Sequence, residues 1–169
     1  MEHYHKVYKA LDEPMEMSFQ MKAVSKQRPR TGRSGHMYTP KETRAFEKMV
    51  AEKAATLLRT PYTCPVAVFI TVYDPIPSSY KGVKRQAAEL NLVSPPVGDL
   101  DNKVKAVTDA LNGIAYVDDK QINFTRAERL YGEGHAILVT VQRNGLSLVE
   151  VQKCGNGYGR QLRDSGGCA

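Results

Sequence analysis

The clearest folding signal in the sequence is an apolar stripe that follows Thr39 and Pro40. Thr39 belongs to the residue types that cap helices, Pro40 suits the first helical position, and Glu42 completes a capping box three residues after Thr39. Apolar residues then recur at helical spacing and stop before Pro61. The stripe consists of Phe46, Met49, Val50, Ala54, Leu57 and Leu58. A helix with one such face must bury it against a second layer of structure.

Segments with the composition of β-strands supply that second layer. They are rich in β-branched and aromatic residues or alternate between apolar and polar positions, and turn residues separate them. The predicted strands are the segment of Met17, Phe19 and Met21, then residues 66–73, 121–130 and 135–141. The last two are joined across Gly132 and Gly134.

Two further helices are predicted between these strands. Residues 80–90 form a short helical candidate that is basic at its start. Residues 101–112 carry Val104, Val107 and Leu111 on one face, and the Asn-Gly pair that follows ends the helix. Residues 114–117 then return to an extended conformation. Strands and helices are interspersed without a regular β-α-β alternation, which favours the α+β class.

Length and composition favour one intracellular domain. We place the domain at residues 1–152, and we predict a disordered tail at residues 153–169, which are rich in glycine and poor in large apolar residues. Three scattered cysteines form neither a disulfide framework nor a zinc motif and are expected to be free thiols in the cytoplasm. No apolar stretch is long enough to span a bilayer, and the polar N-terminus is no signal peptide.

Basic residues gather in two places. Lysine and arginine outnumber aspartate and glutamate by 24 to 18, and residues 22–44 hold seven basic residues and one acidic residue. Such clusters suit the phosphate backbone of a nucleic acid, although each one alone is equally compatible with a solvated loop. The predicted DNA contacts are Lys26, Arg28, Arg30, Arg33, Lys81, Lys84 and Arg85.

Two acidic pairs form a candidate metal site. Asp99 and Asp101 stand where a proline-rich loop enters a helix, and residues two apart in an extended segment point to the same side. Magnesium prefers such oxygen ligands. Lys105 follows one helical turn after Asp101, and a second pair, Asp118 and Asp119, closes the next extended segment. If that segment pairs near the helix start, a third carboxylate joins the first two. The alternative is that Asp101 caps the helix and the second pair forms a turn.

This pattern resembles the signature of RusA-type Holliday junction resolvases. The residues that carry the resemblance are Asp99-Leu100-Asp101-Asn102, Lys105, Asp109, Leu111-Asn112-Gly113, Asp118-Asp119 and Gln121-Ile122. A looser resemblance covers residues 26–43, through Arg28-Pro29-Arg30 and Tyr38-Thr39-Pro40. Together they extend over most of the chain up to about residue 152.

The resemblance implies a small homodimer with a mixed sheet and packed helices. It also implies incision of four-way DNA junctions at symmetric positions, with Mg²⁺ as cofactor and Mn²⁺ as a substitute, leaving 5′-phosphate and 3′-hydroxyl ends. Carried over by position, Asp99, Asp101 and Asp119 are the metal-binding acids, Lys105 is the functional lysine and Asp118 is a supporting acid. The chain departs from some relatives in having Val97-Gly98 where they carry basic residues, and the cluster at 81–85 is the candidate replacement.

Two other functions remain open at this point. The first is a nuclease of the same fold that prefers flaps or other branched DNA, because the acids do not determine which DNA shape is bound. The second is a non-catalytic junction-binding protein whose carboxylates only cap and turn. A binding module gains nothing from negative charge placed against phosphate, so the acid set favours a nuclease. The four histidines show no metal-ligand spacing with these acids.

Overall fold

A four-stranded sheet organises the computed structural model, which describes residues 14–27, 30–31, 37–38, 40–57, 60–96 and 98–146. The strand order is β1-β6-β4-β5. The strands are β1 (Met15–Phe19), β4 (Val66–Pro75), β5 (Ile122–Gly132) and β6 (Ala136–Arg143). β4 pairs in parallel with β5 and antiparallel with β6, and β1 pairs antiparallel with β6. The sheet is therefore mixed, and the predicted α+β class is confirmed.

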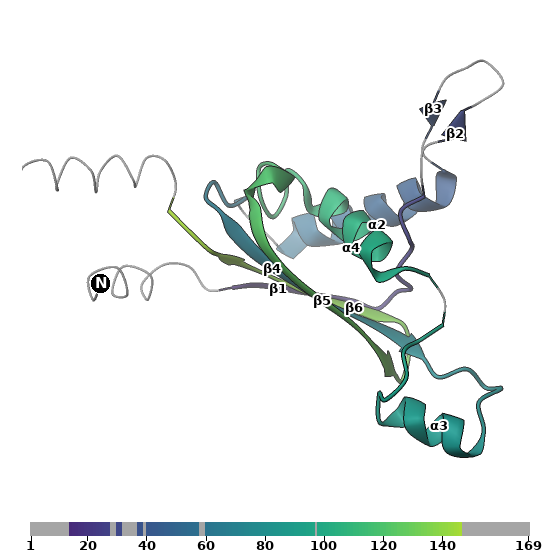
Figure 1. Cartoon of the computed structure of the whole chain (residues 1–169). Coiled ribbons are helices and arrows are strands. Elements are labelled where there is room, and N and C mark those ends of the chain that lie inside the picture. Colours follow the sequence, from purple (N-terminus) through teal and green to yellow (C-terminus); the bar gives the residue numbers. More distant parts are fainter. Residues whose placement is uncertain are drawn as a thin grey trace, which may run out of the picture.

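Two helices cover one face of the sheet (Figure 1). They are α2 (Lys41–Leu57) and α4 (Leu100–Leu111). Alternate residues of β4 point toward them, and the buried side chains of all layers form one core. Its largest fully buried members include Tyr116, Phe19, Phe46, Ile70, Leu111, Ile137, Val50 and Val107. Burial of each such side chain stabilises the fold by roughly 1.5–3 kcal/mol, so this layer pair is the main source of stability.

The structure narrows the stripe predicted for the first helix. α2 buries Thr43, Phe46, Val50 and Ala54. Met49 and Leu57 are 51% and 54% exposed, so their assignment to the buried face was wrong. The cause is that the buried positions follow the spacing i, i+3, i+7, i+11, a narrower stripe than the whole set of apolar residues.

Residues 114–117 also differ from the prediction. Residues 113–115 form a turn, in which Gly113 has φ +75° and donates its N–H to the Tyr116 carbonyl at 2.8 Å, and only then does Tyr116 form a β-bridge with Tyr62. A short 3₁₀ helix, η1 (Asp119–Gln121), then leads into β5. Of the apolar residues that suggested a strand, Ala115 and Tyr116 are buried, whereas Val117 is 55% exposed.

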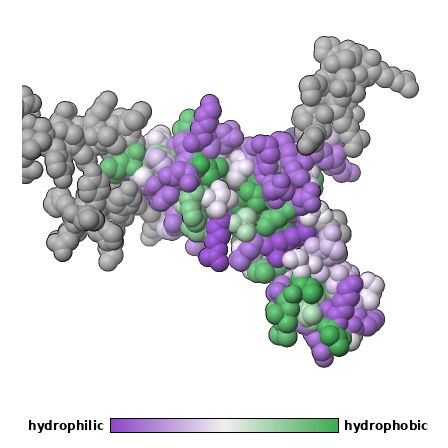
Figure 2. Space-filling model, in the orientation of Figure 1, coloured by the Kyte–Doolittle hydropathy of each residue, from purple (hydrophilic) through white to green (hydrophobic). Residues whose placement is uncertain are grey.

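Two elements lie away from the layer pair, one beyond the end of β4 and the other on the helix side of the sheet (Figure 1). One is α3 (Gly82–Glu89), which confirms the short helix predicted at 80–90. We call residues 76–96, which contain it, the α3 arm. The other is a hairpin of β2 (Arg30–Thr31) and β3 (Met37–Tyr38) beyond the start of α2. Figure 2 shows apolar and polar residues side by side on the α3 arm, where Val83, Leu90 and Leu92 are exposed.

Several other expectations fall partly outside the described residues. Cys64 is a buried thiol, whereas Cys154, Cys168 and the whole predicted tail lie in the undescribed part. Among the helices of the described ranges, none has the length and apolarity that a bilayer span requires.

The Tyr116 hydroxyl fixes the turn after α4 and offers a first test. It donates to the Thr108 carbonyl at 2.7 Å, and burial, together with the negative charges of Asp119 and Asp109, raises the pKa of Tyr116. We predict that Tyr116→Phe lowers the free energy of unfolding by about 1 kcal/mol, because the carbonyl loses its donor. Chemical denaturation measures this, with Tyr73→Phe on β4 as the matched control. An equal loss in the control would contradict a specific role for the Tyr116 hydroxyl.

Candidate active site

Asp99 immediately precedes α4, Asp101 lies in its first turn, and both are exposed. Asp99 is the residue before the helix, with φ −85° and ψ 137°, yet its side chain makes no capping bond to the backbone. The amide of Asn102 donates to Asp99 Oδ2 at 3.4 Å. Because the helix begins at Leu100, the expectation that Asp101 belongs to an extended segment was wrong. Both carboxylates nevertheless stand at the positive end of the helix dipole, and capping does not account for Asp99.

Lys105 follows Asp101 by one turn and is exposed. The alternative to a functional role was a salt bridge with Asp101 or Asp109. Asp109 instead pairs with Lys26, at 2.6 Å between Oδ2 and Nζ. Within the described residues no ion pair involves Lys105, so its ammonium group faces solvent on the same side as Asp101.

Asp118 has a structural role. It caps η1: its Oδ1 accepts from the Lys120 N–H at 2.9 Å, and its own N–H donates to the Gln121 side chain at 2.9 Å. The bond from the Lys120 backbone lowers the pKa of Asp118. Asp119 is the first residue of η1 and is exposed. The turn alternative is thus correct for Asp118, while Asp119 stays open to solvent.

Gln121 anchors the short helix that presents Asp119. Its side-chain amide donates to the carbonyls of Tyr62 at 2.9 Å and Cys64 at 2.8 Å. Sequence reasoning included Gln121 in the motif without giving it a role. The signal was present, because an acceptor followed three residues later by Gln is the spacing of a capping box.

The two acidic pairs lie toward opposite ends of α4. η1 is bound to Tyr62, whose backbone pairs with Ala115 and Val117 just past the end of α4. α4 has 12 residues and is therefore about 18 Å long at 1.5 Å per residue. The segment that carries Asp119 therefore does not pair near the start of α4, and within one chain Asp119 does not join Asp99 and Asp101. No group of three or more His, Cys, Asp and Glu side chains within the described ranges is arranged to hold a metal ion.

Asp99 and Asp101 alone still fit the chemistry of Mg²⁺. This ion is commonly held by one or two carboxylates and keeps several water ligands, with phosphate oxygens completing the shell. Two exposed carboxylates on one helical turn, neither used as a cap, leave those positions open. Asp119 does not add a ligand to the pair within the chain as described.

Lys26, predicted to contact DNA, is held within the protein. Its Nζ lies 2.5 Å from Glu47 Oε1 and 2.6 Å from Asp109 Oδ2, and its N–H donates to the Asn102 carbonyl at 2.8 Å. Lys26 thereby ties the segment after β1 to both α2 and α4. Of the three arginines predicted with it, Arg30 has only its backbone described, in β2, and Arg28 and Arg33 lie outside the described residues.

The second basic cluster lies on the α3 arm and is exposed. Lys81 precedes α3, and Lys84 Nζ is 3.9 Å from the ring centre of Tyr80, a cation–π contact. Arg85 pairs with Glu89 at 2.9 Å, one turn further along α3. Both partners of that pair are about half exposed, so the guanidinium remains accessible to a phosphate.

Comparison with known proteins decides the family. A family model described as endodeoxyribonuclease RusA matches residues 20–142, which include both acidic pairs and most of the sheet. The chain belongs to the RusA endodeoxyribonuclease family. A relative named uncharacterized protein YqaN, from Bacillus subtilis strain 168, is 35% identical over 126 residues, covering 70% of this chain and 89% of that protein.

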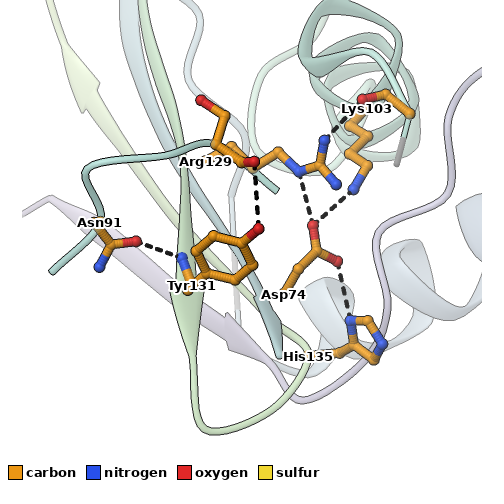
Figure 3. Close-up of polar contacts among 8 residues, drawn as sticks. Asp74, Asn91, Lys103, Arg129, Tyr131 and His135 are labelled. Atoms are coloured by element: carbon orange, nitrogen blue, oxygen red, sulfur yellow. Dashed lines mark hydrogen bonds and ion pairs between the residues drawn. The ribbon is translucent and has the colours of Figure 1, made fainter. Parts of the chain in front are cut away.

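In this RusA family member, a buried ion network joins β4, β5 and α4 and reaches Gly98, the residue before Asp99 (Figure 3). Asp74 Oδ2, near the end of β4, accepts from Lys103 Nζ at 3.1 Å and from Arg129 Nε at 2.7 Å. Asp74 Oδ1 lies 3.1 Å from His135 Nδ1. Burial opposes ionisation of Asp74, but the bonds from Arg129 and Lys103 outweigh it and hold the pKa of Asp74 below its ordinary value. For Lys103 the balance is the opposite: burial outweighs the bond to Asp74 and lowers the pKa of Lys103.

Sequence reasoning missed this network. Asp74 fell just outside the strand predicted at residues 66–73, and Lys103 lies on the face of α4 that was expected to be apolar. No spacing signal joins Asp74, Lys103 and Arg129, because 29 and 26 positions separate them along the chain. Only the parallel pairing of β4 with β5 and the packing of α4 bring them together.

Asp74 predicts a pH-dependent stability. A carboxyl whose pKa is lower in the folded state stabilises the fold above its unfolded pKa, and this contribution disappears as the pH falls through the folded pKa. We predict that Asp74→Asn lowers the free energy of unfolding by about 3 kcal/mol near pH 6, because Lys103 and Arg129 stay buried without their carboxylate. Below the ordinary value of 3.8, the difference from wild type should narrow.

Denaturant unfolding at a series of pH values measures this difference. Glu128→Gln, an exposed carboxylate on β5, is the control and should change stability little at any pH. A constant difference between Asp74→Asn and wild type down to strongly acidic pH would contradict the assignment of a lowered pKa to Asp74.

Proposed function

We propose that this protein is a magnesium-dependent endonuclease that resolves four-way DNA junctions by paired symmetric incisions, leaving 5′-phosphate and 3′-hydroxyl ends. Membership of the RusA endodeoxyribonuclease family supports the reaction class. The observation that carries the proposal is the exposed pair of carboxylates, Asp99 and Asp101, at the start of α4. Carboxylates without a metal would repel phosphate, so their exposure beside basic elements favours a metal-assisted reaction on DNA.

Asp99 and Asp101 would hold the Mg²⁺ ion, with Mn²⁺ as a substitute. When bound, such an ion neutralises phosphate charge and lowers the pKa of a coordinated water. Lys105, one turn along the same side of α4, would stabilise the negative charge that develops on the phosphate or orient the attacking water. Asp118 supports the site indirectly, because it caps the turn that carries Asp119.

The two basic elements would bind the arms of the junction. The α3 arm with Lys81, Lys84 and Arg85 and the β2–β3 hairpin with Arg30 lie at the same end of the molecule as the start of α4 (Figure 1). Arg28 and Arg33, also predicted to contact DNA, lie outside the described residues. Such contacts neutralise phosphates and carry no base specificity, so binding should weaken steeply with salt. Lys26 is left out of this surface because two carboxylates already hold it.

The protein would act as a homodimer, since two symmetric cuts need two equivalent sites. A dimer also bears on Asp119, which lies toward the other end of α4 from Asp99 and Asp101. In a two-fold pair the α4 helices can run antiparallel, and the start of one then faces the end of the other. Asp119 of the partner subunit would complete each site in that arrangement.

The main test is cleavage of a synthetic four-way junction, a flap and a linear duplex, with Mg²⁺ or with EDTA. We predict paired symmetric nicks in the junction only, and none in EDTA. Asp101→Asn should reduce the rate by roughly 100-fold or more, as loss of a preorganised charged group does. Junction binding in EDTA should be retained. Glu52→Gln, exposed on α2, is the control and should cleave like wild type.

Other outcomes of this assay point to the two rival functions. Preferential cutting of the flap would keep the metal site and replace the substrate. Binding of the junction without cutting, in either Mg²⁺ or Mn²⁺, would refute the nuclease and leave a junction-binding protein.

Mixed dimers test the placement of Asp119. Asp101→Asn and Asp119→Asn are each expected to be inactive alone. In an equal mixture, half of the dimers combine the two variants, and a site shared between subunits is intact once in each of these. We therefore expect nicking to recover to roughly one quarter of wild type, with single rather than paired cuts. If native mass spectrometry shows mixed dimers and nicking does not recover, the acids act within one chain.

A further inference from the structure

We propose that Arg129 is a positioning residue, whose buried guanidinium holds the Gly98 carbonyl and thereby fixes where α4 presents Asp99 and Asp101. The inference rests on the proposed function of that acidic pair. It adds a role for a residue on β5, which has no place in the acidic motif, and it makes the sheet the reference from which the site is aligned.

The guanidinium of Arg129 is buried against the carboxylate of Asp74. The side chains of Arg129 and Asp74 are only 9% and 10% exposed. Arginine stays charged in proteins, so its N–H groups need acceptors when water is excluded. Nε donates to Asp74, and Nη1 donates to the Gly98 carbonyl at 2.8 Å. The residue next to Asp99 is thus one of the acceptors that satisfy a buried cation, and the loop cannot shift without breaking that bond.

Gly98 lies close to the side chains of Ser25 and Lys103. Gly98 has φ +80°, a conformation that favours glycine. A Cβ at this position would lie 2.8 Å from Ser25 Oγ and 3.3 Å from Lys103 Cε. Lys103 is itself bound to Asp74. The carbonyl of Gly98 is therefore bound by Arg129, and its Cα lies next to the Lys103 side chain. The carboxylate of Asp74 binds both of these cations.

β5 also binds the end of the α3 arm, through Tyr131. Tyr131, two residues after Arg129 on β5, donates its N–H to Asn91 Oδ1 at 2.6 Å and its hydroxyl to the Ser94 carbonyl at 3.3 Å (Figure 3). Side chains and backbone of β5 thus donate hydrogen bonds to this segment at Asn91 and Ser94 as well as at Gly98. One strand therefore holds the approach to α4 at these three residues.

The geometry of the donors explains why the contact needs an arginine. The planar guanidinium donates from Nε to a carboxylate and from Nη1 to a carbonyl, two atoms held apart in a rigid fork, whereas all three donors of a lysine ammonium leave one nitrogen. Lysine at position 129 can therefore keep the ion pair with Asp74 but not the second bond to Gly98. Arg129→Lys separates the positioning of the loop from the stability of the buried network.

The test compares Arg129→Lys with Arg126→Lys, an exposed arginine on the same strand. The measurements are kcat and KM for junction cleavage, the half-saturating Mg²⁺ concentration, the melting temperature and the amide hydrogen exchange of residues 98–103. For Arg129→Lys we expect a kcat roughly 10- to 100-fold lower with KM for the junction unchanged, because small displacements of reacting groups have large effects. Its amides at 98–103 should exchange faster, and higher Mg²⁺ should be needed. Arg126→Lys should match wild type in all of them.

Three results would overturn the proposal. One is a wild-type kcat and wild-type exchange in Arg129→Lys. Another is a lower melting temperature with unchanged kcat, which would make Arg129 a purely structural residue. If the wild-type protein does not cleave any of the DNA substrates, the proposed function fails while exchange still tests the loop, and unchanged exchange in Arg129→Lys would then refute the positioning role separately.

Discussion

The carboxylate of Asp74 joins the sheet to the helix that carries the acidic pair. It is placed near the end of β4, and it binds one cation from α4 and another from β5. Two buried cations around one carboxylate are not the most stabilising way to fill this space, because apolar side chains of similar size often serve as well or better. What the ions add is directionality: hydrogen bonds fix the angle and height of α4 over the sheet more tightly than apolar contacts do.

The acids of the RusA motif do different things in this chain. Asp99 and Asp101 keep their carboxylates open to solvent, whereas Asp118 uses its own to cap η1. Gln121 then fixes η1 against the segment before β4. A motif that looks like one constellation in the sequence therefore contains both candidate ligands and the residues that hold one of them in place. The distinction follows from hydrogen-bond geometry and not from residue type.

The elements with long periodic patterns were predictable from the sequence. α2, β4, β5 and β6 were recognised with boundaries close to those observed. For α2, β4 and β6, apolar spacing over eight or more residues reflects a buried face, whereas β5 buries only Tyr131 of its residues and was recognised from its composition. The residues after Gly113 were only partly predictable, since a short apolar run suits a turn that leads into a β-bridge as well as a strand. Asp99 and Asp101 were found because they are neighbours in sequence. The partnership of Asp74 and Arg129 was invisible, because sequence pattern carries no information about which distant polar residues meet.

The parallel pairing of β4 with β5 has a consequence for how the protein folds. Everything between Pro75 and Ile122, including α3, α4 and the acidic pair, belongs to one crossover connection between these strands. Closing so long a loop carries an entropic penalty before the strands reward it, and non-local pairings of this kind slow folding. Asp74 and Arg129 meet only when the loop has closed. The loop that presents the acids is therefore assembled late, and a nascent chain that ends before β5 has the acidic motif without the support that positions it.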